Sequence, residues 1–133
     1  MAVFADTFYF LALLNPADEM HARAVAVTNC LTEPMVTTDW VLIELADGLS
    51  RPPARAAAIE FIDALRKDVG ATIVRCDVAI LDRGWDLYRR RLDKGWSLTD
   101  CISFEVMRDQ NISDALTGDR HFEQAGFVAL LRT

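Results

Sequence analysis

Apolar and polar positions follow two different periods along the chain, and each period predicts one kind of element. Short apolar runs bounded by polar or turn-forming residues predict buried strands at residues 2–7, 35–38, 71–76, 114–117 and 127–131. Longer segments, in which apolar residues recur at every third or fourth position, predict helices at residues 8–14, 16–31, 40–49, 51–67, 78–94 and 97–111. Residues 118–125 are typical of a turn followed by a short helix.

Prolines and small polar residues mark the beginnings of these helices. Prolines stand in the first turn of the helices predicted at 16–31 and 51–67, where a missing amide proton is tolerated. Thr38 or Asp39 is predicted to cap the helix at 40–49, and Asp77 the helix after the third strand. Ser97 and Asp100 have the spacing of a capping box.

The alternation of strands and helices predicts an α/β fold of three layers. A central parallel sheet of about five strands is expected between two layers of helices. Right-handed crossovers restrict the topology, and a strand order such as 3-2-1-4-5 places the first strand in the middle. The chain contains no internal repeat and no long linker, so we expect residues 1–133 to form one domain.

The composition is typical of a folded protein, and we expect it to be soluble. Hydrophobic residues make up 52% and charged residues 26%, and no apolar run approaches the ~20 residues of a membrane span. The first residues lack a basic leader, so the cytoplasm is the expected compartment and no membrane partner is expected. Cys30, Cys76 and Cys101 have neither a disulfide nor a zinc spacing, and we expect all three to be buried.

Four carboxylates are predicted to lie at one rim of the sheet. Asp6 ends the first strand, Asp119 follows the fourth, and Asp100 begins the helix that leads into the fourth. Glu44 lies early in the helix after the second strand, among apolar residues. Because ligands of open α/β sheets bind beyond the carboxyl ends of the strands, all four side chains are expected at that edge.

Carboxylates gathered in this way repel one another unless a cation neutralises them. Mg²⁺ or Mn²⁺ prefers oxygen ligands, whereas His21 and His121 have no partner at a zinc spacing. For His121 we expect packing or partner contact, with an approach to substrate phosphate beside Asp119 as the alternative, and for His21 a surface position. The alternative for each aspartate is a structural one, since Asp100 and Asp119 also suit helix caps and Asp6 suits a turn.

The net charge of −6 excludes general attraction of nucleic acid to the whole surface, so RNA would need a local basic patch. The candidates for backbone contacts are Arg51, Arg55, Arg89, Arg90, Arg91 and Lys94. Cations near a helix C-terminus also favour the helix dipole, which is the structural alternative for the last four. Trp40, Trp85 and Trp96 are candidates for base stacking, although the helical spacing of Trp85 favours a place in the core.

Four blocks of the sequence together resemble the signature blocks of PIN-domain proteins. They are FADTFYFLALL, VTTDWVLIELADGL, SLTDCISFEVM and ALTGDRHFEQAGF, and they span nearly the whole chain. The resemblance is to the VapC-like toxins of toxin–antitoxin pairs. It implies a PIN-like fold and a ribonuclease that uses Mg²⁺ or Mn²⁺, forms a homodimer and is inhibited by a cognate antitoxin.

The resemblance also implies roles for single residues. Its acidic positions match Asp6, Glu44, Asp100 and Asp119, and its small hydroxyl positions match Thr7 and Thr99, which are expected to support the acids. Asp6, Asp100 and Asp119 are the expected metal ligands. Glu44 is assigned to orienting the attacking water, accepting its proton or supporting the ligands, and both one-ion and two-ion mechanisms fit.

Two other classes of function fit parts of the pattern. A non-catalytic PIN-like module would keep the acids as caps and use its apolar surface for assembly. A magnesium-dependent phosphatase also carries acids at strand ends, but Asp6 is followed by Thr-Phe instead of completing the Asp-x-Asp pair of such enzymes. Residues 8–14 and the helix at 40–49 are more apolar than a small core requires, which indicates a surface covered by a second copy or by an antitoxin.

Overall fold

The structure is a computed structural model, which describes residues 1–132. Its strands are β1 (Val3–Ala5), β2 (Met35–Thr38), β3 (Ala71–Val74), β4 (Asp114–Leu116) and β5 (Val128–Ala129). Its helices are α1 (Thr7–Leu14), α2 (His21–Cys30), α3 (Asp39–Gly48), α4 (Ala54–Lys67), α5 (Val78–Arg90), α6 (Leu98–Asp109) and α7 (Arg120–Gln124).

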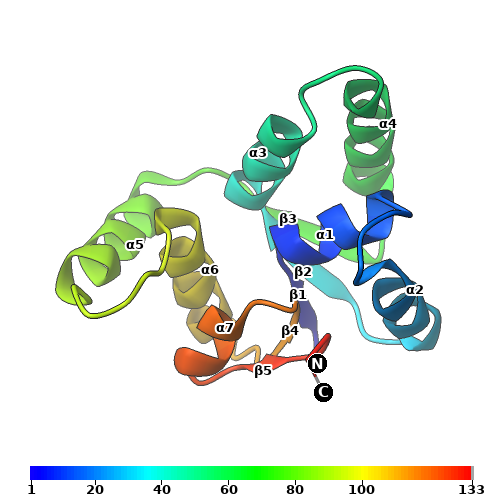
Figure 1. The fold of residues 1–133 in the computed structure, drawn as a ribbon. Helices are drawn as coiled ribbons and strands as arrows, with labels where there is room; N and C mark the ends of the chain where they lie inside the picture. The colour runs from blue at the N-terminus through cyan, green and yellow to red at the C-terminus, as the bar shows by residue number, and fades with distance from the viewer. Residues whose placement is uncertain (133) are drawn as a thin grey trace.

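The strands form one parallel sheet with the order β3-β2-β1-β4-β5, as predicted (Figure 1). In the central strand, Phe4 lies opposite Val36 of β2 and Ala115 of β4. The helices flank the sheet, so the predicted three-layer α/β architecture is confirmed. The carboxyl ends of β1 and β4 therefore lie side by side, which brings Asp6 and residues 117–119 to the same edge.

Aromatic side chains fill the core beside this edge. The Phe104 ring packs edge-on against Phe122 and Trp96, at centroid distances of 4.9 and 5.0 Å. Tyr9 and Phe10 of α1 are fully buried as well. Helix α1 is therefore largely a core element. The expectation that residues 8–14 form apolar surface for a partner is wrong for its buried residues Tyr9, Phe10 and Ala12.

Three predicted caps are confirmed. Thr38 Oγ1 accepts a hydrogen bond from Val41 N at the start of α3, and Asp77 caps α5. Ser97 and Asp100 form a complete capping box at the start of α6. Helices α3, α5 and α6 therefore begin where the sequence predicts.

Two predicted helix boundaries are wrong, the start of α2 and the end of α5. The second helix begins at His21 instead of residue 16, because Asn15 and Asp18 accept hydrogen bonds from the backbone two residues on and form turns there. Helix α5 ends at Arg90, before the predicted limit at residue 94.

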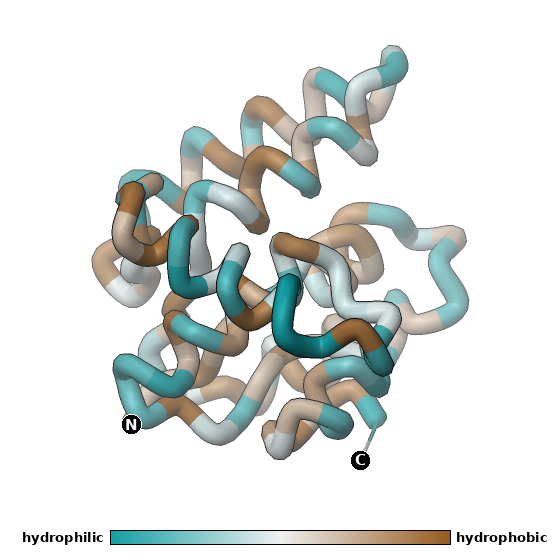
Figure 2. Tube along the Cα trace, turned by 90° about the vertical axis from the view of Figure 1, so that its left-hand side faces the viewer, coloured by the Kyte–Doolittle hydropathy of each residue, from teal (hydrophilic) through white to brown (hydrophobic). Residues whose placement is uncertain are grey.

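The outer face of α5 corrects another expectation. Trp85 is 46% exposed and is not a core residue, because α5 packs on α6 through Gly84 and Leu87. Figure 2 looks onto this side of the molecule, where hydrophobic and hydrophilic residues alternate along the helices.

Cys101 is buried as predicted, whereas Cys30 and Cys76 are exposed, because Cys30 ends α2 and Cys76 follows β3. Within residues 1–132, no helix has the length and apolar character needed to cross a membrane.

Candidate metal centre

Asp6 lies at the carboxyl end of the central strand and is almost completely buried, with 4% of its surface exposed. Its backbone oxygen accepts from the amides of Tyr9 and Phe10 in the first turn of α1, which fixes the turn from β1 into the helix. Burial, and next the charge of Asp100, raises the pKa of the Asp6 carboxyl to about 7. Hydrogen bonds to the carboxylate from Thr117 and from the backbone of Thr7 oppose this rise.

Asp100 lies in the first turn of α6, with its carboxyl largely buried. Asp100 Oδ2 accepts from Ser97 N at 3.1 Å and lies 3.2 Å from His121 Nδ1. Burial, and next the charge of Asp119, raises the pKa of Asp100, while Ser97 and His121 hold it down. The residue therefore takes part in the capping box of its helix and also faces Asp119 and His121, so a structural role does not remove it from the cluster.

Asp119 is the N-cap of the short helix α7. Its Oδ1 accepts from His121 N at 2.9 Å, and its own backbone N donates to Thr117 Oγ1 at 3.1 Å. The same Thr117 hydroxyl donates to Asp6 Oδ2 at 2.8 Å. Thr117 thus joins the first and the last of the predicted acids through one buried oxygen atom.

Glu44 and the two predicted hydroxyl residues border this cluster. The Glu44 side chain is exposed on α3, yet its charge is one of the causes that raise the pKa of Asp6, so it faces the same edge. Thr7 is buried next to Asp6, and its Oγ1 has no hydrogen-bond partner among the described residues. Thr99 lies half-buried beside Asp100 in the first turn of α6.

The donor set fits a divalent cation. Carboxylate oxygens of Asp100 and Asp119 and a ring nitrogen of His121 lie within 4.8 Å of one another. The buried Asp6 lies near enough to Asp100 for the charge of each to act on the other, and Asp119, about a third exposed, lies at the open side of the group. Such a group needs either protons or a cation to stay compact, and hard divalent ions take carboxylate ligands of this kind.

The predicted basic candidates fall in two places. Arg89 and Arg90 lie in the last turn of α5, and Arg91 and Lys94 follow in the loop to α6, where both contact Asp93. Arg91 and Lys94 line a hollow of about 330 Å³ that includes Gly95, Trp96 and Cys101.

That hollow reaches toward the cluster at Gly95, where a Cβ would lie 4.0 Å from His121 Nε2. Arg51 and Arg55 lie elsewhere, before and at the start of α4.

Two residues of the cluster were not predicted as parts of the site. Thr117 stands two positions before Asp119, and the sequence Thr-Gly-Asp contains the signal, because hydroxyl residues often accept from a backbone amide two positions on. For His121 we expected packing or a partner contact, yet its ring lies between Asp100 and Asp119. Its proximity to Asp100 depends on the packing of α7 beside α6, which no local spacing reveals.

Comparisons with known proteins agree with this fold. The chain is 29% identical over 126 residues to the 23S rRNA-specific endonuclease VapC20 of Mycobacterium tuberculosis, with 95% of each protein covered. The crystal structure of that protein, described as a sarcin–ricin loop cleaving toxin, superposes with a TM-score of 0.88 at 28% identity, covering 95% of this chain and 96% of the other.

Two more distant structures share the fold. FitAcB from Neisseria gonorrhoeae has a TM-score of 0.69 at 20% identity, covering 97% of this chain and 95% of the other. VapBC2 from Rickettsia felis, bound to a promoter DNA fragment, has a TM-score of 0.67 at 14% identity and 97% coverage of both chains. The sequence pattern of the PIN domain matches residues 3–128, so the chain belongs to the PIN domain family.

Proposed function

We propose that the protein is a divalent-metal-dependent endoribonuclease that acts as the toxin of a toxin–antitoxin pair. The observation that carries the proposal is Asp6, a buried carboxyl at the end of the central strand with its pKa raised to about 7 beside Asp100. A carboxyl in this position stays ionised at neutral pH when a cation shares its site. The similarity to an rRNA endonuclease over 95% of both chains supports the same reading.

In the proposed site, Asp6, Asp100 and Asp119 hold Mg²⁺ or Mn²⁺, directly or through water. An ion held there would supply Lewis acidity toward the attacking water and the phosphoryl oxygen. Thr117 and the backbone of Thr7 favour the ionised form of Asp6 by donating to its carboxylate, against the larger effect of burial on its pKa. Glu44, exposed at the border, orients the attacking water or accepts its proton. Thr7 and Thr99 complete the border of the site.

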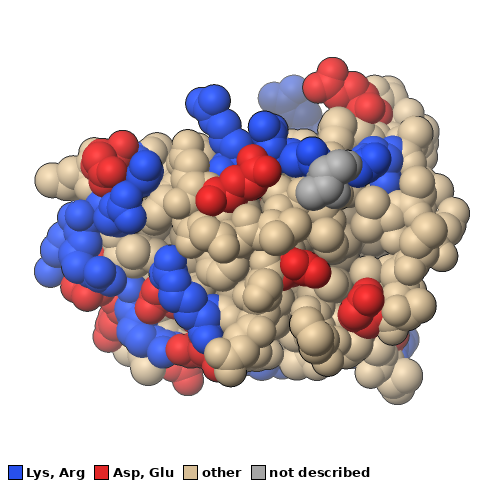
Figure 3. All heavy atoms as spheres, turned by 90° about the horizontal axis from the view of Figure 1, so that it is seen from below, with Lys and Arg blue, Asp and Glu red and all other residues tan. Residues whose placement is uncertain are grey.

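The substrate we propose is a structured RNA. The relative named above is specific for 23S rRNA and is described as cleaving the sarcin–ricin loop, so a hairpin of that loop is the first substrate to test. Figure 3 shows Lys and Arg side chains gathered at the end of the molecule where α5 lies, interleaved with acidic ones. Arg91 and Lys94 are the best placed to bind the RNA backbone, because the hollow that they line reaches toward the cluster at Gly95.

The outer face of α5 is our proposed dimer interface. Its exposed apolar residues follow a spacing of three and four along one stripe, Val78, Leu81, Trp85 and Tyr88, and the exposed Leu92 follows just beyond the end of the helix. Trp85 and Tyr88 stack on each other at a centroid distance of 5.5 Å. A stripe of this kind on a helix that packs through its other side is typical of a helix-to-helix interface.

Charge favours a second copy of this chain as the occupant of the stripe. Asp82 and Arg89 lie seven positions apart on the same side of it. An antiparallel two-fold pairing of α5 would place each Asp82 opposite Arg89 of the second copy, on both sides of the axis. Sedimentation should give a dimer for the wild type and a monomer for Trp85→Ser combined with Tyr88→Ser. The change Ile59→Ser, at another exposed apolar residue, is the control.

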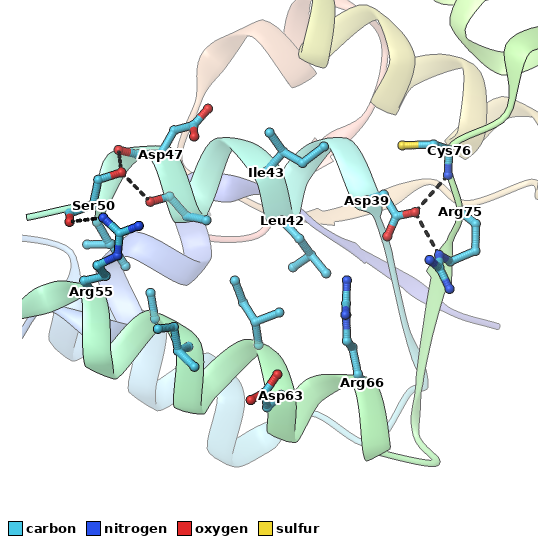
Figure 4. A pocket seen from close by; sticks show the side chains of 15 residues that line it. Asp39, Leu42, Ile43, Asp47, Ser50, Arg55, Asp63, Arg66, Arg75 and Cys76 are labelled. Carbon is cyan, nitrogen blue, oxygen red and sulfur yellow. Dashed lines mark hydrogen bonds and ion pairs between the residues drawn. The ribbon is translucent and has the colours of Figure 1, made fainter.

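The groove between α3 and α4 is our proposed site for an antitoxin segment. It has a volume of about 580 Å³ and an apolar lining that includes Leu42, Ile43 and Ile62. Figure 4 shows Arg55 and Arg66 at its opposite ends, with Asp39, Asp47 and Asp63 in the same lining, a pattern that suits an apolar peptide carrying charges of both signs. Ile43 precedes Glu44 on α3, so a peptide in the groove can reach the acids. A basic side chain of that peptide would then block the metal ligands.

The remaining parts of the proposal follow from the family. We propose that residues 1–133 act as one nuclease domain in the cytoplasm, where its RNA substrate is found. An adjacent reading frame that encodes a short DNA-binding protein would be the antitoxin to test, by co-expression with the wild type and with Ile62→Glu in the groove. If the wild type forms the complex and Ile62→Glu does not, the result supports the groove as the antitoxin site.

The test of the function is cleavage of a sarcin–ricin hairpin in Mn²⁺ by the wild type, Asp6→Asn and Asp100→Asn. We expect cleavage by the wild type, inhibition by EDTA, and rates at least ~100-fold lower in both variants. Asp109→Asn, an exposed acid on the outer end of α6, is the control that should keep full activity. Equal cleavage by all four proteins, or cleavage in EDTA, would refute the proposal.

A further inference from the structure

The ring of His121 lies beside two of the acids, Asp100 and Asp119. Its Nδ1 lies 3.2 Å from Asp100 Oδ2 and 3.4 Å from Asp119 Oδ1. These three atoms come from two helices, α6 and α7, and lie within 4.8 Å of one another. The two carboxylate oxygens that face the nitrogen belong to residues that the proposed function assigns to the ion.

The position of the ring is fixed from several sides. The backbone N of His121 donates to Asp119 Oδ1, which anchors the first turn of α7. One turn later, Gln124 Oε1 accepts from Trp96 Nε1 at 3.0 Å, which ties α7 to the loop before α6. On the other side of the ring, Nε2 faces Gly95, where the missing side chain leaves room. The imidazole is therefore held with Nδ1 toward the acids and Nε2 away from them.

This orientation suits a nitrogen ligand. Ionised carboxylates only accept hydrogen bonds, so without an ion Nδ1 must carry the proton that faces Asp100 and Asp119. An ion among the three atoms would take the place of that proton, while Nε2, directed away from the acids, carries the remaining one. A neutral imidazole with this distribution of protons is a common metal ligand in proteins.

We propose that His121 Nδ1 is a direct ligand of the divalent ion, together with Asp100 and Asp119, and that it makes the site prefer Mn²⁺ to Mg²⁺. Imidazole binds transition-metal ions well, whereas Mg²⁺ is held through carboxylates and water. This inference rests on the proposed function for the presence of the ion. It adds a residue, a donor atom and a metal preference that the four-acid pattern does not contain.

Pulsed electron paramagnetic resonance of Mn²⁺ tests the ligand directly, because it detects coupling of the ion to a bound imidazole nitrogen. The chain has two histidines, so in His21→Asn, purified without a histidine tag, any imidazole signal comes from His121. His21 is a suitable position to change, since its Nδ1 is hydrogen-bonded to the backbone oxygen of Ala12 in a different part of the fold. We expect the nitrogen coupling in this protein and its loss when His121→Asn is added.

Calorimetric titration of the same proteins with Mn²⁺ and Mg²⁺ tests the preference. His121→Asn should weaken Mn²⁺ binding by about 10-fold or more, on the scale of changes at metal sites, and leave Mg²⁺ binding within about 3-fold. Mn²⁺ bound without nitrogen coupling would overturn the ligand role of His121 and leave the nuclease proposal intact. If the wild type binds neither Mn²⁺ nor Mg²⁺, both proposals are overturned.

Discussion

Thr117 Oγ1 and Asp6 Oδ2, 111 positions apart in the sequence, are joined by a buried hydrogen bond of 2.8 Å. The hydroxyl uses its proton for Asp6 and accepts from Asp119 N through a lone pair. One side chain thereby lowers the pKa of the first acid and holds the backbone of the last. Its removal should affect both at once.

Thr117→Val keeps the shape of the side chain and removes both hydrogen bonds. The backbone N of Asp119 would lose its acceptor, so we expect the free energy of unfolding to fall by about 1–3 kcal/mol. Loss of the bond to Asp6 raises the pKa of that carboxyl further, so the rise of activity with pH should move to higher pH. Thr117→Ser is the control, and a pH profile of cleavage for the two variants is the measurement. Identical profiles would contradict the role given to the hydroxyl.

The stability of the metal-free protein should decrease as the pH rises toward neutrality and beyond. Folding raises the pKa of Asp6 from its ordinary value of 3.8 to about 7, so between these values the folded state binds more protons than the unfolded state. The free energy of unfolding therefore falls with pH in this window, by an amount on the order of 4 kcal/mol at full ionisation. Urea unfolding in EDTA between pH 4 and pH 8, as approximate limits of that window, measures this decline.

Asp6→Asn separates the contribution of Asp6 from that of other groups. The variant cannot ionise at this position, so its free energy of unfolding should rise relative to that of the wild type as the pH rises. Adding Mn²⁺ at pH ~8 should restore the stability of the wild type and leave that of the variant unchanged. Parallel pH curves for the two proteins would show that Asp6 does not titrate as described.

Asp100 and Ser97 share a capping box but should differ in their effect on activity. Ser97→Ala removes the acceptor for Asp100 N and should lower the free energy of unfolding by about 1 kcal/mol while cleavage stays close to normal. Asp100→Asn keeps an oxygen that can accept from Ser97 N, so it should fold and lose cleavage. The comparison of urea unfolding with cleavage rate in both variants is the measurement. Equal losses of activity would mean that Asp100 acts mainly as a cap.

The sequence predicts the fold well because its signals are local. The β-branched run of β2, the cap at Thr38 and the capping box at Ser97 each determine a boundary within a few residues. The rim position of Asp6 follows from the parallel topology alone, since β1 and β4 end at the same edge.

The details that the sequence does not predict depend on contacts between distant segments. The spacing of Trp85 places it on an apolar stripe, but the packing of Gly84 against Ile102 decides that this stripe faces outward. His121 is similar, because the approach of α7 to α6 brings its ring to Asp100. Periodicity identifies which residues share a helix face, and tertiary packing decides what that face meets.

Gly84→Ala should destabilise the contact of α5 with α6. A Cβ at this position would lie 2.4 Å from Ile102 Cγ1 and 3.1 Å from Ile102 Cα, so the two helices must separate. We expect the free energy of unfolding to fall by about 1–3 kcal/mol, despite the better helix propensity of alanine. Gly48→Ala is the matched control in α3, since its Cβ would meet Leu11 Cδ2 at 3.8 Å, an ordinary contact. A stability of Gly84→Ala equal to that of this control, by urea unfolding, would contradict the close packing.

Equilibrium binding of Mn²⁺ at neutral pH, by calorimetric titration of the wild type, Asp6→Asn, Asp100→Asn and Asp119→Asn, tests the metal centre most directly. If the three acids hold the ion together, the wild type should bind Mn²⁺ saturably, and each variant should bind it at least ~10-fold more weakly. Asp109→Asn should bind as the wild type does. Undiminished binding in the three site variants, or no saturable binding by the wild type, would contradict the account.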